Sequence, residues 1–123
     1  MKLLIADDSC LLCEKIVGLL ADLNGIEIVG QVQEAQEALN AARELKPDVM
    51  TLDIQMIGGC GIDVLKQIKS QRQSPVVIML TNRSSSPYRR RCIEAGADFF
   101  LDKSTEFGEV RKIVKGLLAV RSQ

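Results

Sequence analysis

Hydrophobic and polar positions along the chain alternate between two patterns, short continuous apolar runs and stretches with the spacing of an amphipathic helix. The apolar runs have the length of strands that are buried on both faces. We predict strands near residues 2–6, 26–32, 48–53, 76–80 and 98–102. The helical spacing predicts helices near residues 10–23, 34–45, 61–71, 87–95 and 106–120.

This regular exchange of strand and helix predicts the fold class. Strands that alternate with helices form parallel βα units joined by right-handed crossovers. With 123 residues the chain has room for one domain and not for a second. We therefore expect a single α/β domain built on an open, five-stranded parallel sheet.

Two elements depart from the general pattern. Residues 26–28 alternate as Ile-Glu-Ile, which is typical of an edge strand with one exposed face. The helix near 87–95 begins with Pro87, Tyr88 and three arginines, so it has little apolar surface to bury. We expect it to be the least firmly anchored helix, either as a switch element or as an ordinary peripheral helix.

Charge and hydropathy exclude several classes of function. The chain carries 16 basic and 16 acidic residues and no histidine, so its net charge of zero provides no attractive field for nucleic acid or for an anionic membrane. The first residues lack a basic leader, and no stretch approaches the about 20 apolar residues of a membrane span. We expect a cytoplasmic protein that binds neither membrane nor nucleic acid.

The four cysteines are Cys10, Cys13, Cys60 and Cys92. Cys10 and Cys13 form a C-x-x-C, the spacing of many redox pairs. The acidic residues just before them raise a thiol pKa, whereas a redox site needs it lowered. We expect reduced cysteines in the core or on helix surfaces, with fast and selective alkylation as the observation that would favour a redox role.

Reactive side chains fall where the predicted strands end. Asp7 and Asp8, Asp53, Thr81 and Lys103 each follow or close an apolar run. Because parallel strands all end at the same edge of the sheet, we expect these groups to meet at one rim, where open α/β sheets bind ligands. Three carboxylates and one ammonium leave a charge near minus two, which suits Mg²⁺, and the added hydroxyl suits a phosphoryl group.

With these motifs in place, the chain resembles the receiver domain of bacterial two-component response regulators over essentially its whole length, residues 1–123. The matching motifs are the acidic pair in Ile5-Ala6-Asp7-Asp8-Ser9, Asp53 with Met56 and Gly61 behind it, Thr81 and Lys103. The resemblance implies a doubly wound (βα)5 flavodoxin-like domain with strand order 2-1-3-4-5.

The resemblance also implies the chemistry of the rim. Asp53 would accept a phosphoryl group from a histidine kinase or a histidine phosphotransfer protein. Mg²⁺ would bind Asp8, Asp53 and the backbone carbonyl of Gln55, with Asp7 acting directly or through water. Lys103 would pair with Asp53 and then with a phosphate oxygen.

Further positions receive roles from the same resemblance. Thr81 would move to bind another phosphate oxygen, with Asn82 beside it where a small residue is usual. Phe100 falls at the place of the switch aromatic, whose pose reshapes the surface of the fourth helix, fifth strand and fifth helix. Gln55 and Arg83 stand at positions that tune the lifetime of the phosphoryl group. Ile57 and Ser104 replace prolines that are usual in the family.

The implied function is a signalling module with at most self-catalysed phosphotransfer and hydrolysis. An output protein is expected as a further partner, and a homodimer on phosphorylation is possible. One alternative is an aspartyl-phosphate phosphohydrolase of the haloacid dehalogenase type, although such enzymes have D-x-D-x-[TV] after the first strand. Another is a flavodoxin-like FMN carrier, in which Asp7 and Asp8 would repel the cofactor phosphate.

Overall fold

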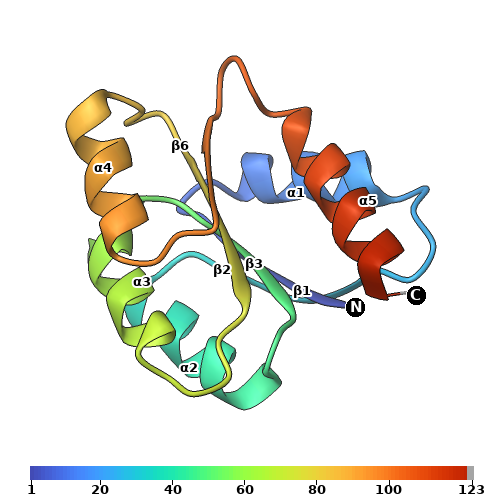
Figure 1. The fold of residues 1–123 in the computed structure, drawn as a ribbon, viewed down its shortest axis with the longest axis horizontal. Coiled ribbons are helices and arrows are strands. Elements are labelled where there is room, and N and C mark those ends of the chain that lie inside the picture. The colour runs from blue at the N-terminus through green and yellow to red at the C-terminus, as the bar shows by residue number, and fades with distance from the viewer. Residues whose placement is uncertain (122–123) are drawn as a thin grey trace.

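The computed structural model, which describes residues 1–121, has a five-stranded parallel sheet in the order β2-β1-β3-β6-β7 (Figure 1). When only the five strands of this sheet are numbered in chain order, their order is the predicted 2-1-3-4-5. The predicted α/β fold class is confirmed. The sheet consists of β1 (Lys2–Ala6), β2 (Glu27–Val32), β3 (Val49–Leu52), β6 (Val76–Thr81) and β7 (Phe99–Asp102). The prediction of an edge position for the second strand is also confirmed. Residues 122–123, the end of the predicted domain, lie outside the described part.

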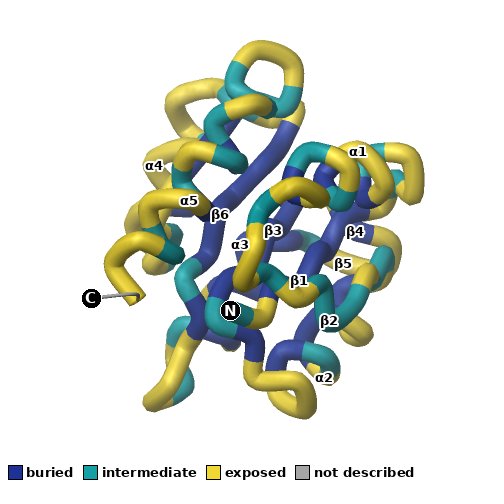
Figure 2. The backbone as a smooth tube through the Cα atoms, turned by 90° about the vertical axis from the view of Figure 1, so that its right-hand side faces the viewer, coloured by how far each residue is buried: buried dark blue, intermediate teal, exposed yellow. Residues whose placement is uncertain are grey.

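Helices cover both faces of the sheet (Figure 1). One face carries α1 (Cys10–Leu20) and α5 (Glu109–Arg121), and the other carries α2 (Ala35–Leu45), α3 (Gly61–Lys69) and α4 (Ser86–Glu94). The central strands are buried and the outer sides of the helices are exposed (Figure 2). Among the described residues, no helix has the length and apolar character needed to cross a membrane.

The alternation of side chains along each strand creates two separate cores. In β1, Leu3 and Ile5 pack toward α1 and α5, whereas Leu4 and Ala6 pack toward the helices of the opposite face. Leu3, Leu4 and Ile5 have no measurable exposed surface. Burial of each such large side chain stabilises the fold by about 1.5–3 kcal/mol, so the strand ends that carry the reactive groups are held from both sides.

Two helix ends differ from the predictions by three residues each, and one element was not predicted. The first helix ends at Leu20, and the last begins at Glu109 because the preceding residues form a hydrogen-bonded loop. In that loop the Asp102 carboxylate accepts hydrogen bonds from the backbone N–H groups of Ser104 and Thr105. A short antiparallel hairpin, β4 (Gln55–Met56) and β5 (Gly59–Cys60), was not predicted.

The helix α4 matches its predicted weak anchoring. Cys92 is the residue of this helix that is fully buried, with 0% of its surface exposed, and all three arginines are exposed. A helix held by so few apolar contacts shifts at low cost in free energy.

The cysteines are free thiols. Cys10 is exposed and Cys13 is buried. Burial, with added repulsion from Asp7 and Cys10, raises the pKa of Cys13 to about 11. A thiol with this pKa is protonated at neutral pH, so Cys13 belongs to the core as expected and is not activated for redox chemistry.

Gly61, at the start of α3, packs directly against the backbone at the end of β3. A Cβ atom at this position would lie 1.8 Å from the carbonyl oxygen of Asp53 and 2.7 Å from its carbonyl carbon. Both contacts are with backbone, which cannot rotate away as a side chain can. The close approach therefore ties α3 to the residue that follows β3.

We predict that Gly61→Ala lowers the free energy of unfolding by about 3 kcal/mol or more, because either β3 or α3 must move. Gly116→Ala is the matched control, since a Cβ there meets no atom within 4 Å. In the helix α5 this control change should raise stability by about 0.5–1 kcal/mol. Urea denaturation measures both variants, and a similar effect of the two changes would contradict the role of the close approach.

Candidate functional site

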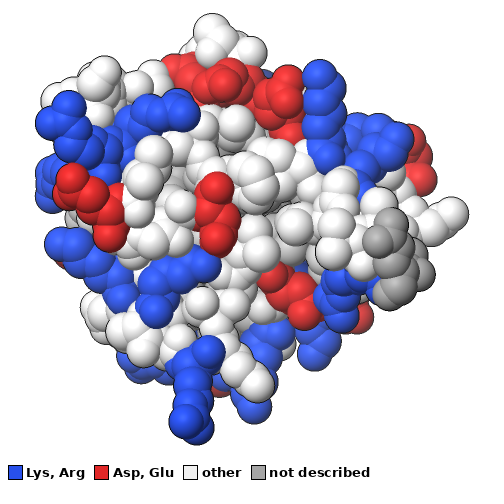
Figure 3. All heavy atoms as spheres, in the orientation of Figure 1, with Lys and Arg blue, Asp and Glu red and all other residues white. Residues whose placement is uncertain are grey.

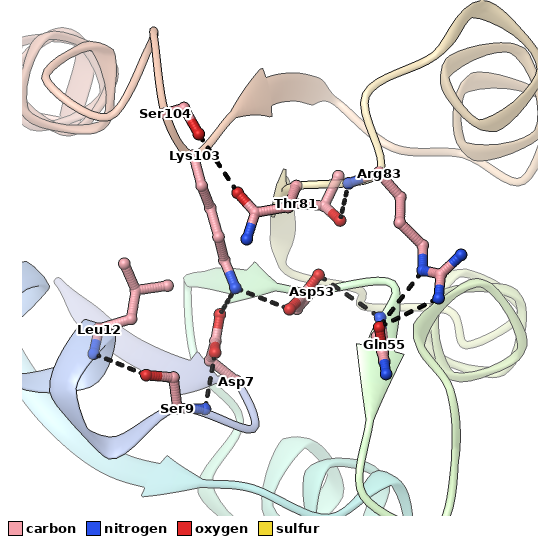
Figure 4. Close-up of polar contacts among 10 residues, drawn as sticks. Asp7, Ser9, Leu12, Asp53, Gln55, Thr81, Arg83, Lys103 and Ser104 are labelled. Atoms are coloured by element: carbon pink, nitrogen blue, oxygen red, sulfur yellow. Dashed lines mark hydrogen bonds and ion pairs between the residues drawn. The ribbon is translucent and has the colours of Figure 1, made fainter.

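The predicted reactive groups meet at the carboxyl ends of the sheet strands (Figure 4). Asp7 follows β1, Asp53 follows β3, Thr81 is the last residue of β6, and Lys103 follows β7. Backbone hydrogen bonds continue past the strand ends and fix three of these positions. The N–H of Asp7 donates to Val32 at 3.0 Å, that of Asp53 to Ala6 at 3.1 Å, and that of Lys103 to Thr81 at 3.0 Å.

The three carboxylates form one cluster. Asp7, Asp8 and Asp53 each offer a carboxylate oxygen, and these oxygens lie within 4.8 Å of one another. Asp7 and Asp53 are buried, with 2% and 4% of their surface exposed, whereas Asp8 is exposed. Like charges at this separation repel strongly in a partly buried site, so the cluster needs a positive group.

Lys103 supplies the positive charge inside the cluster. Its Nζ atom lies 2.7 Å from Asp53 Oδ2 and 2.8 Å from Asp7 Oδ2 (Figure 4). The pairing with Asp53 was predicted, and the equally short pairing with Asp7 was not. Burial lowers the pKa of Lys103, but hydrogen bonds to Asp53 and Asp7 outweigh that effect, and the pKa lies above its ordinary value.

One ammonium does not balance three carboxylates. Burial raises the pKa of Asp7 to about 6, in spite of the lowering effects of Lys103 and of the Ser9 N–H, and repulsion from Asp53 adds to the rise. Asp8 takes part in no ion pair among the residues that the structure describes. An all-oxygen cluster with a charge near minus two is the donor set that Mg²⁺ prefers, so the residues present fit this ion.

The cluster opens into a pocket of ≈ 330 Å³. Its polar lining includes Asp8, Asp53, Gln55, Thr81, Asn82 and Lys103. The pocket thus contains most of the residues that the sequence singled out, while Asp7 contacts Lys103 beneath it. A pocket with this polar lining has room for a small phosphorylated group.

Opposite the carboxylates, the loop after β6 forms one wall of the pocket. Thr81 is buried, and its Oγ1 accepts a hydrogen bond of 3.0 Å from the N–H of Arg83. The Arg83 guanidinium donates to Gln55 Oε1 (Figure 4). Asn82 Oδ1 accepts from Ser104 Oγ at 3.5 Å, which connects this wall with the loop after β7.

Phe100 lies away from the pocket in the core of the α2–α4 face, with 7% of its surface exposed. The guanidinium carbon of Arg89 lies 5.7 Å from the centre of its ring, a cation–π distance. The predicted switch aromatic therefore occupies an inward position, and its switching role stays a prediction.

Three polar contacts near the site escaped the sequence analysis. Ser84 Oγ donates to Asp102 Oδ2, which links the loop after β6 to the end of β7. Tyr88 contacts Arg83 through its hydroxyl and its ring. The sequence around a serine in a polar loop or a tyrosine on a helix does not indicate which side chain it contacts. These pairs are therefore visible only in the structure.

Comparison with known proteins agrees with this geometry. The sequence profile of the response regulator receiver domain matches residues 3–115. The chain is 31% identical over 119 residues to the response regulator GacA of Pseudomonas syringae pv. syringae (strain B728a), with 97% of this chain and 56% of GacA covered. The chain thus spans about half the length of this relative.

Two solved structures illustrate the likeness in fold. The response regulator domain of Thermotoga maritima CheB superposes with a TM-score of 0.81 at 28% identity, covering 99% of this chain and 94% of that one. The signal receiver domain of Mycobacterium tuberculosis NarL gives a TM-score of 0.86 at 25% identity and covers 94% of each chain. With a profile match over most of its length, this fold and this acidic rim, the chain belongs to the receiver domains of two-component response regulators.

Proposed function

We propose that residues 1–123 form the phosphoacceptor receiver of a two-component phosphorelay and that Asp53 accepts the phosphoryl group. The observation that carries this proposal is the unequal environment of the two Asp53 oxygens. Oδ2 is held by Lys103 at 2.7 Å, whereas Oδ1 receives one long hydrogen bond of 3.4 Å from the Gln55 N–H. Oδ1 is therefore the freer nucleophile, and it belongs to a residue that lines the open pocket.

The proposed reaction is an in-line displacement. An Asp53 oxygen forms a bond to phosphorus as the bond between phosphorus and the donor's histidine nitrogen breaks, and the histidine, already protonated on its other ring nitrogen, leaves as a neutral imidazole. The donor is a histidine kinase or a histidine phosphotransfer protein. Lys103 would bind one phosphoryl oxygen. The Thr81 hydroxyl would donate its hydrogen to another, because its hydrogen bond with the Arg83 N–H uses a lone pair of the oxygen and not the hydrogen.

We propose Mg²⁺ as the cofactor, held by Asp7, Asp8, Asp53 and the backbone carbonyl of Gln55. When bound, Mg²⁺ neutralises charge that develops on the phosphoryl oxygens. The unbalanced carboxylate cluster supports this assignment, since its oxygens are already gathered within 4.8 Å. Burial raises the pKa of Asp7, so keeping this carboxylate charged at neutral pH lowers the stability of the folded protein.

Neither alternative function has an observation in its favour. The loop after β1 has Asp7, Asp8 and Ser9 where a haloacid dehalogenase-type enzyme has D-x-D-x-[TV]. A flavin phosphate at this rim would meet the Asp7, Asp8 and Asp53 carboxylates. The receiver is therefore a signalling module.

For the output of the signal we propose the surface formed by α4, β7 and α5. Basic side chains gather over α4 on the left of Figure 3, and Arg89, Arg90 and Arg91 are exposed. Thr81 would move toward the phosphoryl group, and the pose of Phe100 would change with it. These movements would reshape the surface to which an output protein or a second copy of the chain binds. An increase in apparent mass in gel filtration with beryllofluoride would support the homodimer.

The phosphoacceptor assignment predicts a Mg²⁺-dependent mass increase of one phosphoryl group when the protein is incubated with acetyl phosphate or phosphoramidate. Asp53→Asn should abolish the increase, because the amide is not a nucleophile of comparable strength. Asp63→Asn, at an exposed position of α3, is the matched control and should be modified like the wild type. Intact-protein mass spectrometry reads the result, and an unmodified wild type or a modified Asp53→Asn would contradict the assignment.

The metal assignment predicts that Mg²⁺ raises the midpoint of thermal unfolding, as any ligand of the folded state does. Asp8→Asn should weaken Mg²⁺ binding by about tenfold or more, because a charged oxygen ligand is lost. Without Mg²⁺ the same variant should be at least as stable as the wild type, since one source of carboxylate repulsion is gone.

Asp63→Asn again serves as the control for this experiment and should keep the wild-type response to Mg²⁺. Equal stabilisation of Asp8→Asn and wild type by Mg²⁺ would show that Asp8 is not a ligand.

A further inference from the structure

Arg83 is held at the edge of the pocket by contacts on two sides. Its Nε and Nη2 atoms donate to Gln55 Oε1 at 3.3 and 3.2 Å. Its Nη1 atom donates to the Tyr88 hydroxyl at 3.3 Å, and its guanidinium carbon lies 5.8 Å from the centre of the Tyr88 ring. Arg83 thereby connects the short strand β4 with α4.

These contacts occupy the Gln55 carbonyl oxygen. An amide oxygen has two lone pairs, and here two guanidinium N–H groups are directed at it. Gln55 lines the phosphoacceptor pocket, and its backbone N–H contacts Asp53. With its lone pairs filled, the side-chain oxygen cannot accept a hydrogen bond from a water molecule that approaches phosphorus.

Arg83 cannot replace Gln55 as the group that accepts a hydrogen bond from this water molecule. A guanidinium has only donors and stays protonated, so it cannot accept a proton or orient a water molecule by accepting its hydrogen. The contact between Arg83 and Gln55 (Figure 4) therefore removes a hydrogen-bond acceptor from the pocket that both residues line.

Tyr88 is suited to hold Arg83 in place. Its ring is half-buried and packs against the core of the α2–α4 face, so the hydroxyl has a defined position. Arg83 itself is exposed, and a long exposed side chain without such a contact samples many rotamers. The one tyrosine of the chain is therefore in a position to keep the arginine against Gln55.

We propose that Tyr88 is a positioning residue that, through Arg83 and Gln55, slows hydrolysis of the phosphoryl group on Asp53. This inference rests on the proposed phosphoacceptor role of Asp53. In the hydrolysis, the oxygen of water forms a bond to phosphorus and the bond from phosphorus to the Asp53 oxygen breaks. Asp53 leaves as a carboxylate, and both protons of the water stay with the inorganic phosphate.

The position of Tyr88 on α4 has a consequence for regulation. Because α4 is weakly anchored, a partner that displaces it also withdraws the Tyr88 hydroxyl from Arg83. Binding of such a partner to α4 would then also shorten the lifetime of the phosphoryl group on Asp53.

The test is a double-mutant cycle on the decay of the phosphorylated protein. Wild type, Tyr88→Phe, Tyr88→Ala, Arg83→Ala and the Tyr88→Ala/Arg83→Ala double variant are phosphorylated with phosphoramidate and Mg²⁺, freed of donor by rapid desalting, and followed by intact mass. Tyr88→Phe should decay about twofold faster and Tyr88→Ala about fivefold faster than wild type. Glu94→Gln, an exposed change on the same helix, should decay like the wild type.

The double variant separates positioning from a general effect on the fold. If Tyr88 acts through Arg83, adding Tyr88→Ala to Arg83→Ala should cause no further acceleration. Equal acceleration by Tyr88→Ala in both backgrounds, unchanged decay or slower decay would each overturn the inference while leaving the phosphoacceptor role intact. A wild type that takes up no phosphoryl group would overturn the proposed function and this inference with it.

Discussion

The ion pairs of Lys103 with Asp7 and Asp53 are the interactions on which the site depends. Three carboxylates gathered at one sheet edge repel one another, and one ammonium at 2.7–2.8 Å from two of them permits the arrangement without a metal. The neutralisation is partial and leaves the negative charge that the proposed Mg²⁺ would balance, while burial raises the pKa of Asp7 to about 6. The proposed phosphoryl transfer depends on this incomplete charge balance, because the remaining negative charge suits Mg²⁺.

The fold supplies this arrangement through the rigidity of its strand ends. Side chains of β1 are buried on both faces of the sheet, and backbone hydrogen bonds extend to Asp7, Asp53 and Lys103 themselves. Gly61 adds a contact between α3 and the carbonyl of Asp53. The opposite wall, from Thr81 to α4, is held by polar contacts and few apolar ones, so the carboxylate of Asp53 is held more firmly than the wall that faces it.

The sequence predicted the parts of the structure that follow from periodicity. Strand ends mark the positions of Asp7, Asp53, Thr81 and Lys103, and the parallel topology brings them together. The sequence could not predict the β4–β5 hairpin, whose strands are too short for a period to show. It also missed the second partner of Lys103 and the contact of Tyr88 with Arg83, because such pairs depend on side-chain rotamers and on distances across loops.

Because Lys103 neutralises part of the charge of the carboxylate cluster, its replacement should change both the stability of the fold and the response to Mg²⁺, and unfolding of Lys103→Met with and without Mg²⁺ measures both. Methionine keeps much of the apolar stem and removes the charge. We expect the variant to lose about 2 kcal/mol or more of stability without Mg²⁺ and to be stabilised by Mg²⁺ more than the wild type is. Unchanged stability without the ion, or an equal gain from Mg²⁺ in both proteins, would show that Lys103 does not relieve the repulsion among the carboxylates.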